Sequence, residues 1–459
     1  MTENPRRGAL HIVILAGGAG RNMKAAGVKV LTPVFFRPMI RYVLDAAMAL
    51  PHLTLRVVVG AEEKRVREEC RDYPNLQFSR QETPLGTADA VRAVESSLMG
   101  QDGDVLILYA DCVLLSPAAL QGLLDAHAES GAGCTVASAA AVDRGGELGV
   151  LNAEQSAKPA AGAVGVYCFR LPALFDALRR LPPGGAQREF RLEDAVAALA
   201  AGGTKTAEYA FDDPAEALDI DDLYELWRVE TVLRGRFHRS LMLKGVILRD
   251  PATTVIDPRC RIDRDVVIEG GVTVLNSTLE SGAYVESGCR IVDSQVAGGS
   301  RLKQGTRVEK SRVGRNCVVG PYAHLRPDTH LSDDVRIGNF VELKNATVGA
   351  GTKVSHLSYI GDAAVGRNVN VGCGFITCNY DGGPVKQRTI IEDGVFIGSD
   401  SQAIAPVTLG AGSFVATGTS VTEDVPPDSF VISRGRQVTK PGYAKKYGRA
   451  KSASTPPVP

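Results

Sequence analysis

The sequence lacks the features that mark several large classes of protein. No run of about 18 apolar residues occurs, so no membrane span is expected. The 52 basic residues are balanced by 52 acidic ones, so no net charge favours binding to a nucleic acid or a membrane surface. The nine cysteines form no CxxC pair and lie near no paired histidines, so a zinc site is not expected. We expect free thiols and a cytoplasmic location.

With 459 residues, the chain is too long for one ordinary core, and two or three domains are expected. Up to about residue 240, short apolar runs alternate with amphipathic stretches. The expected strands are Leu10–Ala16, Leu55–Val59 and Val105–Tyr109, and the expected helices are Pro38–Leu50, Thr87–Leu98 and Pro117–Glu129. This alternation predicts an α/β doubly wound, Rossmann-like domain at 9–222, with a parallel sheet covered by helices on both faces. A linker helix is expected at 223–245.

The second half of the chain repeats. Aliphatic residues recur at steps of six, with a step of five at intervals: 262, 268, 274, 279, 285, 291, 296, 302, 308 and 313, then 319 to 371, and again 391 to 421. This period fits neither a helix nor simple strand alternation. It predicts a left-handed parallel β-helix of hexapeptide repeats at 246–437, with three strands and 17 to 18 residues per coil. Gly, Asn and Asp are expected at the corners, where the backbone needs positive φ.

Two further segments depart from this repeat. A ten-residue interruption at 379–388 predicts a loop that leaves the solenoid, where functional residues are often found. Residues 438–459, which end in Thr-Pro-Pro-Val-Pro, are expected to form a disordered tail.

A glycine-rich loop follows the first expected strand. It reads Leu15-Ala16-Gly17-Gly18-Ala19-Gly20-Arg21-Asn22-Met23, and Lys29 comes shortly after it. Glycines let backbone N–H groups approach phosphates, and a cation neutralises a triphosphate. An ordinary tight turn is the alternative, but the position of the loop in a doubly wound sheet favours a nucleotide site. Gln81 adds an amide able to read a base edge, and Thr87 is expected to be a helix N-cap.

Two acidic segments suggest a metal. Asp111 ends a buried strand, and Asp219-Ile220-Asp221-Asp222 precedes the linker helix. Two carboxylates from distant parts of a chain can hold Mg²⁺ where it bridges phosphates. The alternative is that Asp111 is a turn residue and that Asp221 or Asp222 caps the helix. Beside the glycine loop, we favour the metal site.

Several outward positions of the solenoid carry reactive or binding side chains. They are Arg326, Lys344, His356, Tyr359, Asn379, Tyr380 and Arg434. His356 lies off the inward positions 354 and 360, so its imidazole is expected to point outward. An outward histidine is often idle surface, but a neutral imidazole near cations suits proton transfer beside a bound phosphate.

With these motifs, the chain resembles the bifunctional glucosamine-1-phosphate N-acetyltransferase / N-acetylglucosamine-1-phosphate uridylyltransferase family from about residue 10 to 437. The most similar blocks are His324-Leu-Arg-Pro327, Gly338-Asn-Phe-Val-Glu-Leu-Lys344, His356-Leu-Ser-Tyr-Ile-Gly-Asp362, Cys378-Asn-Tyr-Asp-Gly382 and Gly398-Ser-Asp400. The resemblance implies a nucleotidyltransferase-like first domain, an acetyltransferase second domain, and a homotrimer with acetyl-transfer sites between subunits. It implies Mg²⁺ as cofactor and acetyl-CoA, UTP and glucosamine-1-phosphate as substrates.

The resemblance also implies roles for single residues. His356 would be the catalytic base. The sugar phosphate would contact Arg326, Lys344, Tyr359 and Asn370. Acetyl-CoA would contact Cys373, Asn379, Tyr380, Ser399, Thr417 and Arg434, where the family usually has alanine at the positions of Cys373 and Thr417. The nucleotide and its sugar would contact Leu15, Ala16, Gly17, Gly18, Lys29, Gln81, Gly86, Thr87, Tyr109 and Gly149. The metal would be held by Asp111 and Asp221, the latter at a position where the family has asparagine.

The first domain departs from the family pattern. The family reads Leu-Ala-Ala-Gly-x-Gly-Thr-Arg-Met, whereas here Asn22 takes the arginine's place, and Val28 replaces a proline. Ala163 stands where the family has a sugar-binding asparagine, and the segment at 150–165 is shortened. Three alternatives therefore remain: a working bifunctional enzyme, an acetyltransferase whose first domain is degenerate or differently specific, and a non-catalytic trimeric scaffold.

Overall fold

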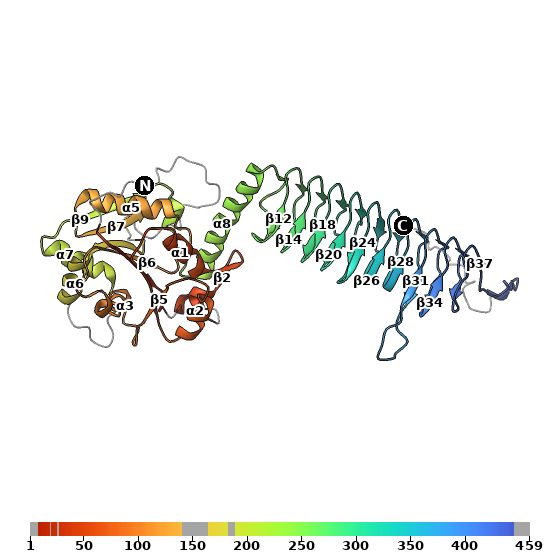
Figure 1. Cartoon of the computed structure of the whole chain (residues 1–459), viewed down its shortest axis with the longest axis horizontal. Coiled ribbons are helices and arrows are strands. Elements are labelled where there is room, and N and C mark those ends of the chain that lie inside the picture. Colours follow the sequence, from red (N-terminus) through yellow and green to blue (C-terminus); the bar gives the residue numbers. More distant parts are fainter. Residues whose placement is uncertain (1–7, 19, 25–26, 140–163, 182–188, 445–459) are drawn as a thin grey trace, which may run out of the picture. The chain divides into compact units, whose positions relative to one another are not determined.

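The computed structural model describes residues 8–18, 20–24, 27–139, 164–181 and 189–444 (Figure 1). The chain divides into two compact units, Met1–Phe237 and His238–Pro459. The division falls within one long helix, α8 (Leu223–Leu243). Within the described residues, no helix is both long and apolar enough to cross a membrane. All nine cysteines are free thiols.

The first unit is built on a sheet with the strand order β5-β4-β1-β6-β8-β7-β9. The strands are β1 (Leu10–Leu15), β4 (Thr54–Val59), β5 (Gln77–Arg80), β6 (Asp104–Tyr109), β7 (Cys134–Ala139), β8 (Val166–Arg170) and β9 (Thr206–Phe211). Strand β1 pairs in parallel with β4 and β6, but β8 runs antiparallel to both β6 and β7. The expected parallel sheet is therefore mixed, because β8 lies between β6 and β7 and runs in the opposite direction to both.

Helices cover both faces of this sheet (Figure 1). They are α1 (Met39–Met48), α2 (Glu63–Glu69), α3 (Thr87–Arg92), α4 (Glu95–Leu98), α5 (Pro117–Ser130), α6 (Leu171–Arg180) and α7 (Leu192–Ala201). Successive residues of β1 face opposite sides, so Ile12 and Ile14 pack in one core with α1 and α5, while Val13 packs in a second core with α3, α6 and α7. The single helix expected at 87–98 is divided into α3 and α4.

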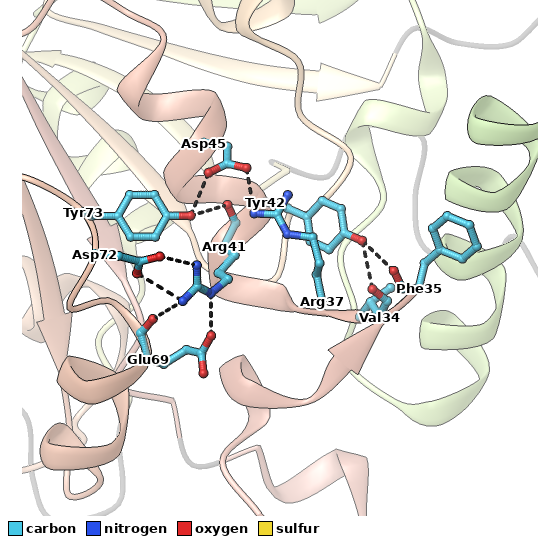
Figure 2. Close-up of polar contacts among 9 residues, drawn as sticks. All are labelled: Val34, Phe35, Arg37, Arg41, Tyr42, Asp45, Glu69, Asp72 and Tyr73. Atoms are coloured by element: carbon cyan, nitrogen blue, oxygen red, sulfur yellow. Dashed lines mark hydrogen bonds and ion pairs between the residues drawn. The ribbon is translucent and has the colours of Figure 1, made fainter. Parts of the chain in front are cut away.

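A polar network ties α1 to its neighbours (Figure 2). Arg41 donates to the carboxylates of Glu69 and Asp72, with 3.0 Å between its Nη1 and Asp72 Oδ2. The next residue, Tyr42, donates its hydroxyl to the carbonyl oxygen of Val34 at 2.9 Å. Val34 belongs to a small hairpin formed by β2 (Pro33–Val34) and β3 (Arg37–Pro38). Helix α1 thus holds both the end of α2 and this hairpin.

The second unit is a left-handed parallel β-helix. Its short strands run from β10 (Ile247–Leu248) to β37 (Phe430–Val431), and within residues 238–444 they form an 11-stranded and a 17-stranded sheet. Parallel pairing joins Val285 to Leu302, Leu302 to Val319, and Val319 to Ile337. These steps of 17 or 18 residues confirm the predicted coil length. The repeated aliphatic residues are buried, apart from the half-buried Ile262 in the first coils.

Two classes of special position shape the coils. The corners have positive φ at polar residues such as Asn276 and Asp293, as expected. Glycines directly after an inward residue have another cause, because adjacent coils are too close for a side chain there. A Cβ on Gly372 would lie 2.6 Å from the backbone nitrogen of Ser399, and one on Gly410 would lie 2.5 Å from that of Pro427.

Candidate active sites

The first candidate site lies at the carboxyl ends of the parallel strands, the edge where open α/β sheets usually bind ligands. Lys29 begins a short 3-10 helix (Lys29–Leu31) after β1, Asp111 follows β6, and Asp221 precedes α8. The Lys29 Nζ lies 2.7 Å from Asp111 Oδ2 and 3.1 Å from Asp221 Oδ1. Three residues from distant parts of the chain therefore meet at one point.

Charge and burial act against each other at this point. Burial raises the pKa of Asp111, and the nearby ammonium of Lys29 opposes that rise. Burial also acts to lower the pKa of Lys29, but the charges and hydrogen bonds of Asp111 and Asp221 outweigh it and raise the pKa. The ammonium therefore stays charged between the two carboxylates.

The same carboxylates suit a metal ion. Oxygens from Asp111 and Asp221 already converge on one cation, the ammonium of Lys29. Within the described residues, no group of three or more His, Cys, Asp or Glu is arranged to hold a metal. Mg²⁺ often binds through one or two carboxylates and takes its remaining ligands from phosphates and water. The donor set therefore fits Mg²⁺ only together with a phosphate ligand.

The adjacent aspartate has a different task. Asp222 Oδ1 accepts the backbone N–H groups of Tyr224 and Glu225, both at 2.8 Å, and so caps α8. The backbone N–H of Asp221 donates to Glu225 Oε2 at 2.7 Å, which leaves the Asp221 carboxylate on the side of Lys29. The capping interpretation is therefore confirmed for Asp222, and the metal interpretation stays a prediction for Asp221.

Helix α8 and the segment after Lys29 are also connected. The backbone N–H of Phe35, at the tip of the β2–β3 hairpin, donates to Glu230 Oε1 on α8 at 2.9 Å. The Phe35 ring lies 5.8 Å from the ring of Phe237 on the same helix. The hairpin that follows Lys29 is therefore held against the helix that follows Asp221.

Gln81 and the glycines lie at the same edge. The buried Gln81 donates through Nε2 to Asp89 Oδ2 at 2.9 Å and to the Gly86 carbonyl at 3.2 Å. A Cβ on Gly17 would lie 3.1 Å from Gln81 Oε1, and one on Gly86, where φ is +111°, would lie 2.3 Å from the Phe190 carbonyl oxygen. Gly86 is therefore required by close backbone approach and positive φ, a Cβ on Gly17 would need a small shift of the Gln81 side chain, and a Cβ on Gly18 would meet no atom within 4 Å. The backbone at Gly18 is therefore open to a ligand.

The other expected contacts of this site have mixed outcomes. The prediction that Thr87 caps a helix is wrong: Gly86 is the N-cap of α3, and the Thr87 hydroxyl instead accepts the N–H of Leu192 at 3.0 Å. Leu15 ends β1, and Ala16 donates its N–H to the Val58 carbonyl at 2.8 Å. The Tyr109 ring lies 6.0 Å from Tyr167. Gly149 and Ala163 lie outside the described residues.

The second candidate site follows one edge of the β-helix. Strands β25 (Arg336–Asn339), β27 (Lys353–His356), β29 (Asn370–Val371), β32 (Phe396–Ile397) and β35 (Phe414–Val415) are successive neighbours in the 11-stranded sheet. Two positions after the inward residue of each strand stand Asn339, His356, Cys373, Ser399 and Thr417, which we call the corner ladder. Arg434 donates to the Thr417 carbonyl at 2.8 Å. Four predicted site residues and the arginine thus follow one line.

The side chains of the corner ladder are accessible. His356, Ser399 and Thr417 are exposed, and Cys373 is half-buried. The ring of His356 bonds through Nδ1 to Asn339 Oδ1 at 2.8 Å. Both residues line a groove of about 920 Å³ that also includes Lys303 and Arg336. A ligand could therefore reach the imidazole from solvent.

Three predicted sugar-phosphate residues lie on another face. Arg326, Lys344 and Tyr359 belong to or follow strands of the 17-stranded sheet: β23 (His324–Leu325), β26 (Glu342–Val348) and β28 (Tyr359–Val365). Arg326 pairs with Glu342 at 2.7 Å, and Glu342 lies opposite Tyr359 in register. Asn370 is separate from them, because it begins β29 on the face that carries His356.

The loop at 379–388 projects from the coils, as predicted (Figure 1). Its first residue, Asn379, is buried and donates to the Asp362 carboxylate and, at 3.4 Å, to the Tyr359 hydroxyl. Tyr380 is exposed. Asn379 therefore fixes the base of the loop beside Tyr359.

Four residues of these sites were missed from the sequence: Asn339, Glu342, Asp362 and Asp89. Each bonds to a predicted residue, namely His356, Arg326, Asn379 and Gln81. The spacing of 17 residues between Asn339 and His356, which is one coil, could have revealed the first pair.

Comparison with known proteins finds a family match in the first half of the chain and relatives that match nearly all of it. The family of MobA-like NTP transferase domains matches residues 12–197. The bifunctional protein GlmU of Geobacter metallireducens is 42% identical, over 96% of this chain and 99% of its own length. The bifunctional protein GlmU of a Geobacillus species is 37% identical over the same shares, and that of Pelobacter propionicus is 41% identical over 94% of this chain and 97% of its own length. The similarity therefore extends through both units.

Proposed function

Since the chain belongs to the family of bifunctional GlmU proteins, we propose that it makes UDP-N-acetylglucosamine in two steps. The β-helix transfers an acetyl group from acetyl-CoA to glucosamine-1-phosphate. The first unit then transfers a uridylyl group from UTP to N-acetylglucosamine-1-phosphate and releases pyrophosphate.

The corner ladder is the observation that carries the first activity. The sugar amine attacks the thioester carbonyl, the C–N bond forms, the C–S bond breaks, and CoA leaves as a thiolate. His356 accepts the proton that the amine loses, and this proton then passes to the thiolate to give the free thiol of CoA. The acetyl-CoA would extend past Cys373, Ser399 and Thr417 towards Arg434, because these residues continue the line that begins at His356.

The division of the sugar-phosphate residues between two faces supports a homotrimer. Arg326, Lys344 and Tyr359 lie on one sheet, and His356 lies on another. Cations on one subunit would hold the phosphate while the base and the acetyl-CoA face belong to its neighbour. A site between subunits therefore needs at least a second copy of the chain.

An apolar ridge beside His356 gives independent support for the trimer. Tyr322, Phe340 and Leu357 occupy corner positions with φ of +53°, +55° and +42°, and all three are exposed. Bulky residues rarely adopt such φ values. The Tyr322 and Phe340 rings stack at 5.7 Å. We assign this ridge to the contact with a second copy, which would remove the three side chains from water.

In the first unit, Lys29, Asp111 and Asp221 are the proposed catalytic group. Asp111 and Asp221 would hold Mg²⁺, which when bound neutralises charge on the triphosphate. Lys29 would supply a second positive charge, and the open backbone at Gly18 would approach the phosphates. Gln81 has one amide oxygen left for the nucleotide base, because its nitrogen is used within the protein.

The order Arg21-Asn22 supports a slow second step. Where the family has threonine followed by arginine, this chain has arginine followed by an exposed asparagine. The same observation favours the second candidate function, an acetyltransferase whose first domain accepts another nucleotide or sugar. Val28 causes no further damage, since it packs on the core.

A two-part assay of the purified protein tests both steps. Acetyl-CoA with glucosamine-1-phosphate should give normal acetyl transfer, and UTP with N-acetylglucosamine-1-phosphate should give weak but detectable pyrophosphate release. No acetyl transfer would overturn the first proposal. For the trimer, sedimentation of a stable, fully active monomer would remove the idea of a shared site.

A further inference from the structure

The imidazole of His356 has one of its two nitrogens already engaged within its own chain. Asn339, at the end of β25, lies directly opposite His356, at the end of β27. The distance from His356 Nδ1 to Asn339 Oδ1 is 2.8 Å. The backbone brings the two side chains together, because a Cβ on Gly338 would lie only 1.7 Å from the Ser355 carbonyl oxygen.

The atoms of this contact decide where the imidazole carries its proton. An amide oxygen can only accept, so the Nδ1 of a neutral His356 must be the donor. The proton then sits on Nδ1, and Nε2 keeps a free lone pair. Hydrogen bonds of this kind select the tautomer and the ring orientation of catalytic histidines.

We propose that Asn339 is a positioning residue, which fixes the tautomer of His356 and aims its Nε2 at the substrate amine. This inference rests on the proposed acetyl transfer. In that reaction, Nε2 takes the amine proton while the hydrogen bond from Nδ1 to Asn339 persists. Asn339 itself neither gains nor loses a proton in this step.

Among the neighbours of His356 on the adjacent strands, Asn339 is the group that accepts the hydrogen bond from Nδ1. On the two adjacent strands, the groups that can titrate or carry charge are Arg336 on β25 and Cys373 after β29, with Lys353 on β27 itself and Tyr359 across the corner. None of them is a carboxylate that could accept from Nδ1. A neutral amide also lets the imidazole lose its proton again more readily than a carboxylate would.

The first test compares two substitutions of Asn339 in the full-length protein. Asn339→Ala removes the acceptor, and acetyl transfer should fall about 10- to 100-fold in kcat with little change in KM. Asn339→Asp keeps an acceptor, so it should retain more activity than Asn339→Ala at alkaline pH. Its acid limb should move to higher pH, because the carboxylate stabilises the protonated imidazole.

Asn276→Ala is the matched control. Asn276 also bonds to the next coil through its side chain, at 2.7 Å to Asp293, but it lies far from His356 in the sequence. It should leave kcat and the pH profile unchanged. Equal losses in Asn276→Ala and Asn339→Ala would show that any lost bond between coils suffices, and that would overturn the proposal. So would an Asn339→Asp variant as inactive as Asn339→Ala at every pH, since the amide nitrogen would then be the group that matters.

A second measurement does not depend on activity. Nitrogen NMR of histidine-labelled protein, with the His356 signal assigned by its loss in His356→Gln, reports which ring nitrogen is protonated. The proton should be on Nδ1 in the unaltered protein and should redistribute towards Nε2 in Asn339→Ala. Protonation of Nε2 in the unaltered protein contradicts the proposal even if acetyl transfer is fast. Protonation of Nδ1 without acetyl transfer would instead refute the proposed function and leave only the effect of Asn339 on the tautomer supported.

Discussion

The two candidate sites are assembled in different ways. In the β-helix, the five positions of the corner ladder recur once per coil, at steps of 17, 17, 26 and 18 residues, so each coil places the next residue of the site. In the first unit, Lys29, Asp111 and Asp221 come from three segments that only the tertiary fold brings together. In a site built by repetition, one residue can be lost while the others keep their positions. In a site built by convergence, the arrangement depends on every segment.

The largest expected effect is at His356, the proposed catalytic base in the corner ladder. His356→Gln should lower acetyl transfer by about 10² or more, the usual range for losing a general base. Uridylyl transfer, folding and oligomeric state should persist, because the side chain points outward. The initial rate of acetyl transfer is the measurement. His330→Gln, an exposed histidine on β24 (Thr329–Leu331), is the control. Near-normal turnover in His356→Gln would mean that another group takes the proton.

A comparable loss is expected at the convergent site. Asp111→Asn removes a charge from the metal pair, and uridylyl transfer should fall about 10²- to 10³-fold. Acetyl transfer should not change. Asp222→Asn is the matched control, because asparagine also caps helices and the Asp222 carboxylate accepts from the backbone at the start of α8. The rate of pyrophosphate release decides: equal effects of both substitutions would place the metal elsewhere.

The double substitution Arg21→Thr with Asn22→Arg sharpens the comparison in the opposite direction. It restores the family's order, and a correctly aimed cation lowers the barrier by a few kcal/mol. We expect uridylyl transfer to rise about 10-fold or more, while UTP–Mg²⁺ binding, already detectable in the unaltered protein, changes less. The measurement is the initial rate of pyrophosphate release. A high rate in the unaltered protein, or a lower rate in the double variant, would show that Arg21 already reaches the phosphates.

The smallest effect concerns stability. Gly372→Ala should destabilise the β-helix by about 1–3 kcal/mol, because its Cβ would press on the next coil. Gly18→Ala should change the free energy of unfolding by less than about 0.5 kcal/mol, because the space beside it is open. Urea unfolding of each variant, followed by a probe in its own unit, measures the difference. Similar values for both would mean that the coils separate without cost.

The sequence predicted the β-helix more completely than the first unit. Inward residues such as Val285 and Leu302 recur with a fixed step, and the step alone gives the coil. Hydrophobic runs do not encode strand direction, so the antiparallel β8 was not foreseen. The Thr87 cap failed because the hydroxyl bonds to Leu192, 105 residues away, which no local pattern reveals.

The candidate sites follow the same rule. The outward direction of His356 could be predicted from its position between two inward residues. Its partner Asn339 was missed, since many outward positions carry polar side chains and only the register selects one of them. The pairing of Asp111 with the acidic segment at 219–222 was proposed from the residues themselves. That Lys29 lies between them was not predicted, because distance in sequence carries no information on distance in space.

The corner ladder also fixes a distance along the axis of the β-helix. Neighbouring strands lie about 4.8 Å apart, so the three steps from His356 to Thr417 span about 14 Å along the axis of the coils. In the proposed function, the number of coils rather than the shape of a pocket would therefore set how far acetyl-CoA extends from His356. Removal of one whole coil between His356 and Arg434 would shorten the distance between them by about 4.8 Å and leave the imidazole in place. If Arg434 binds the far end of acetyl-CoA as proposed, a shortened acyl donor should lose that contact and still place its thioester carbonyl beside His356.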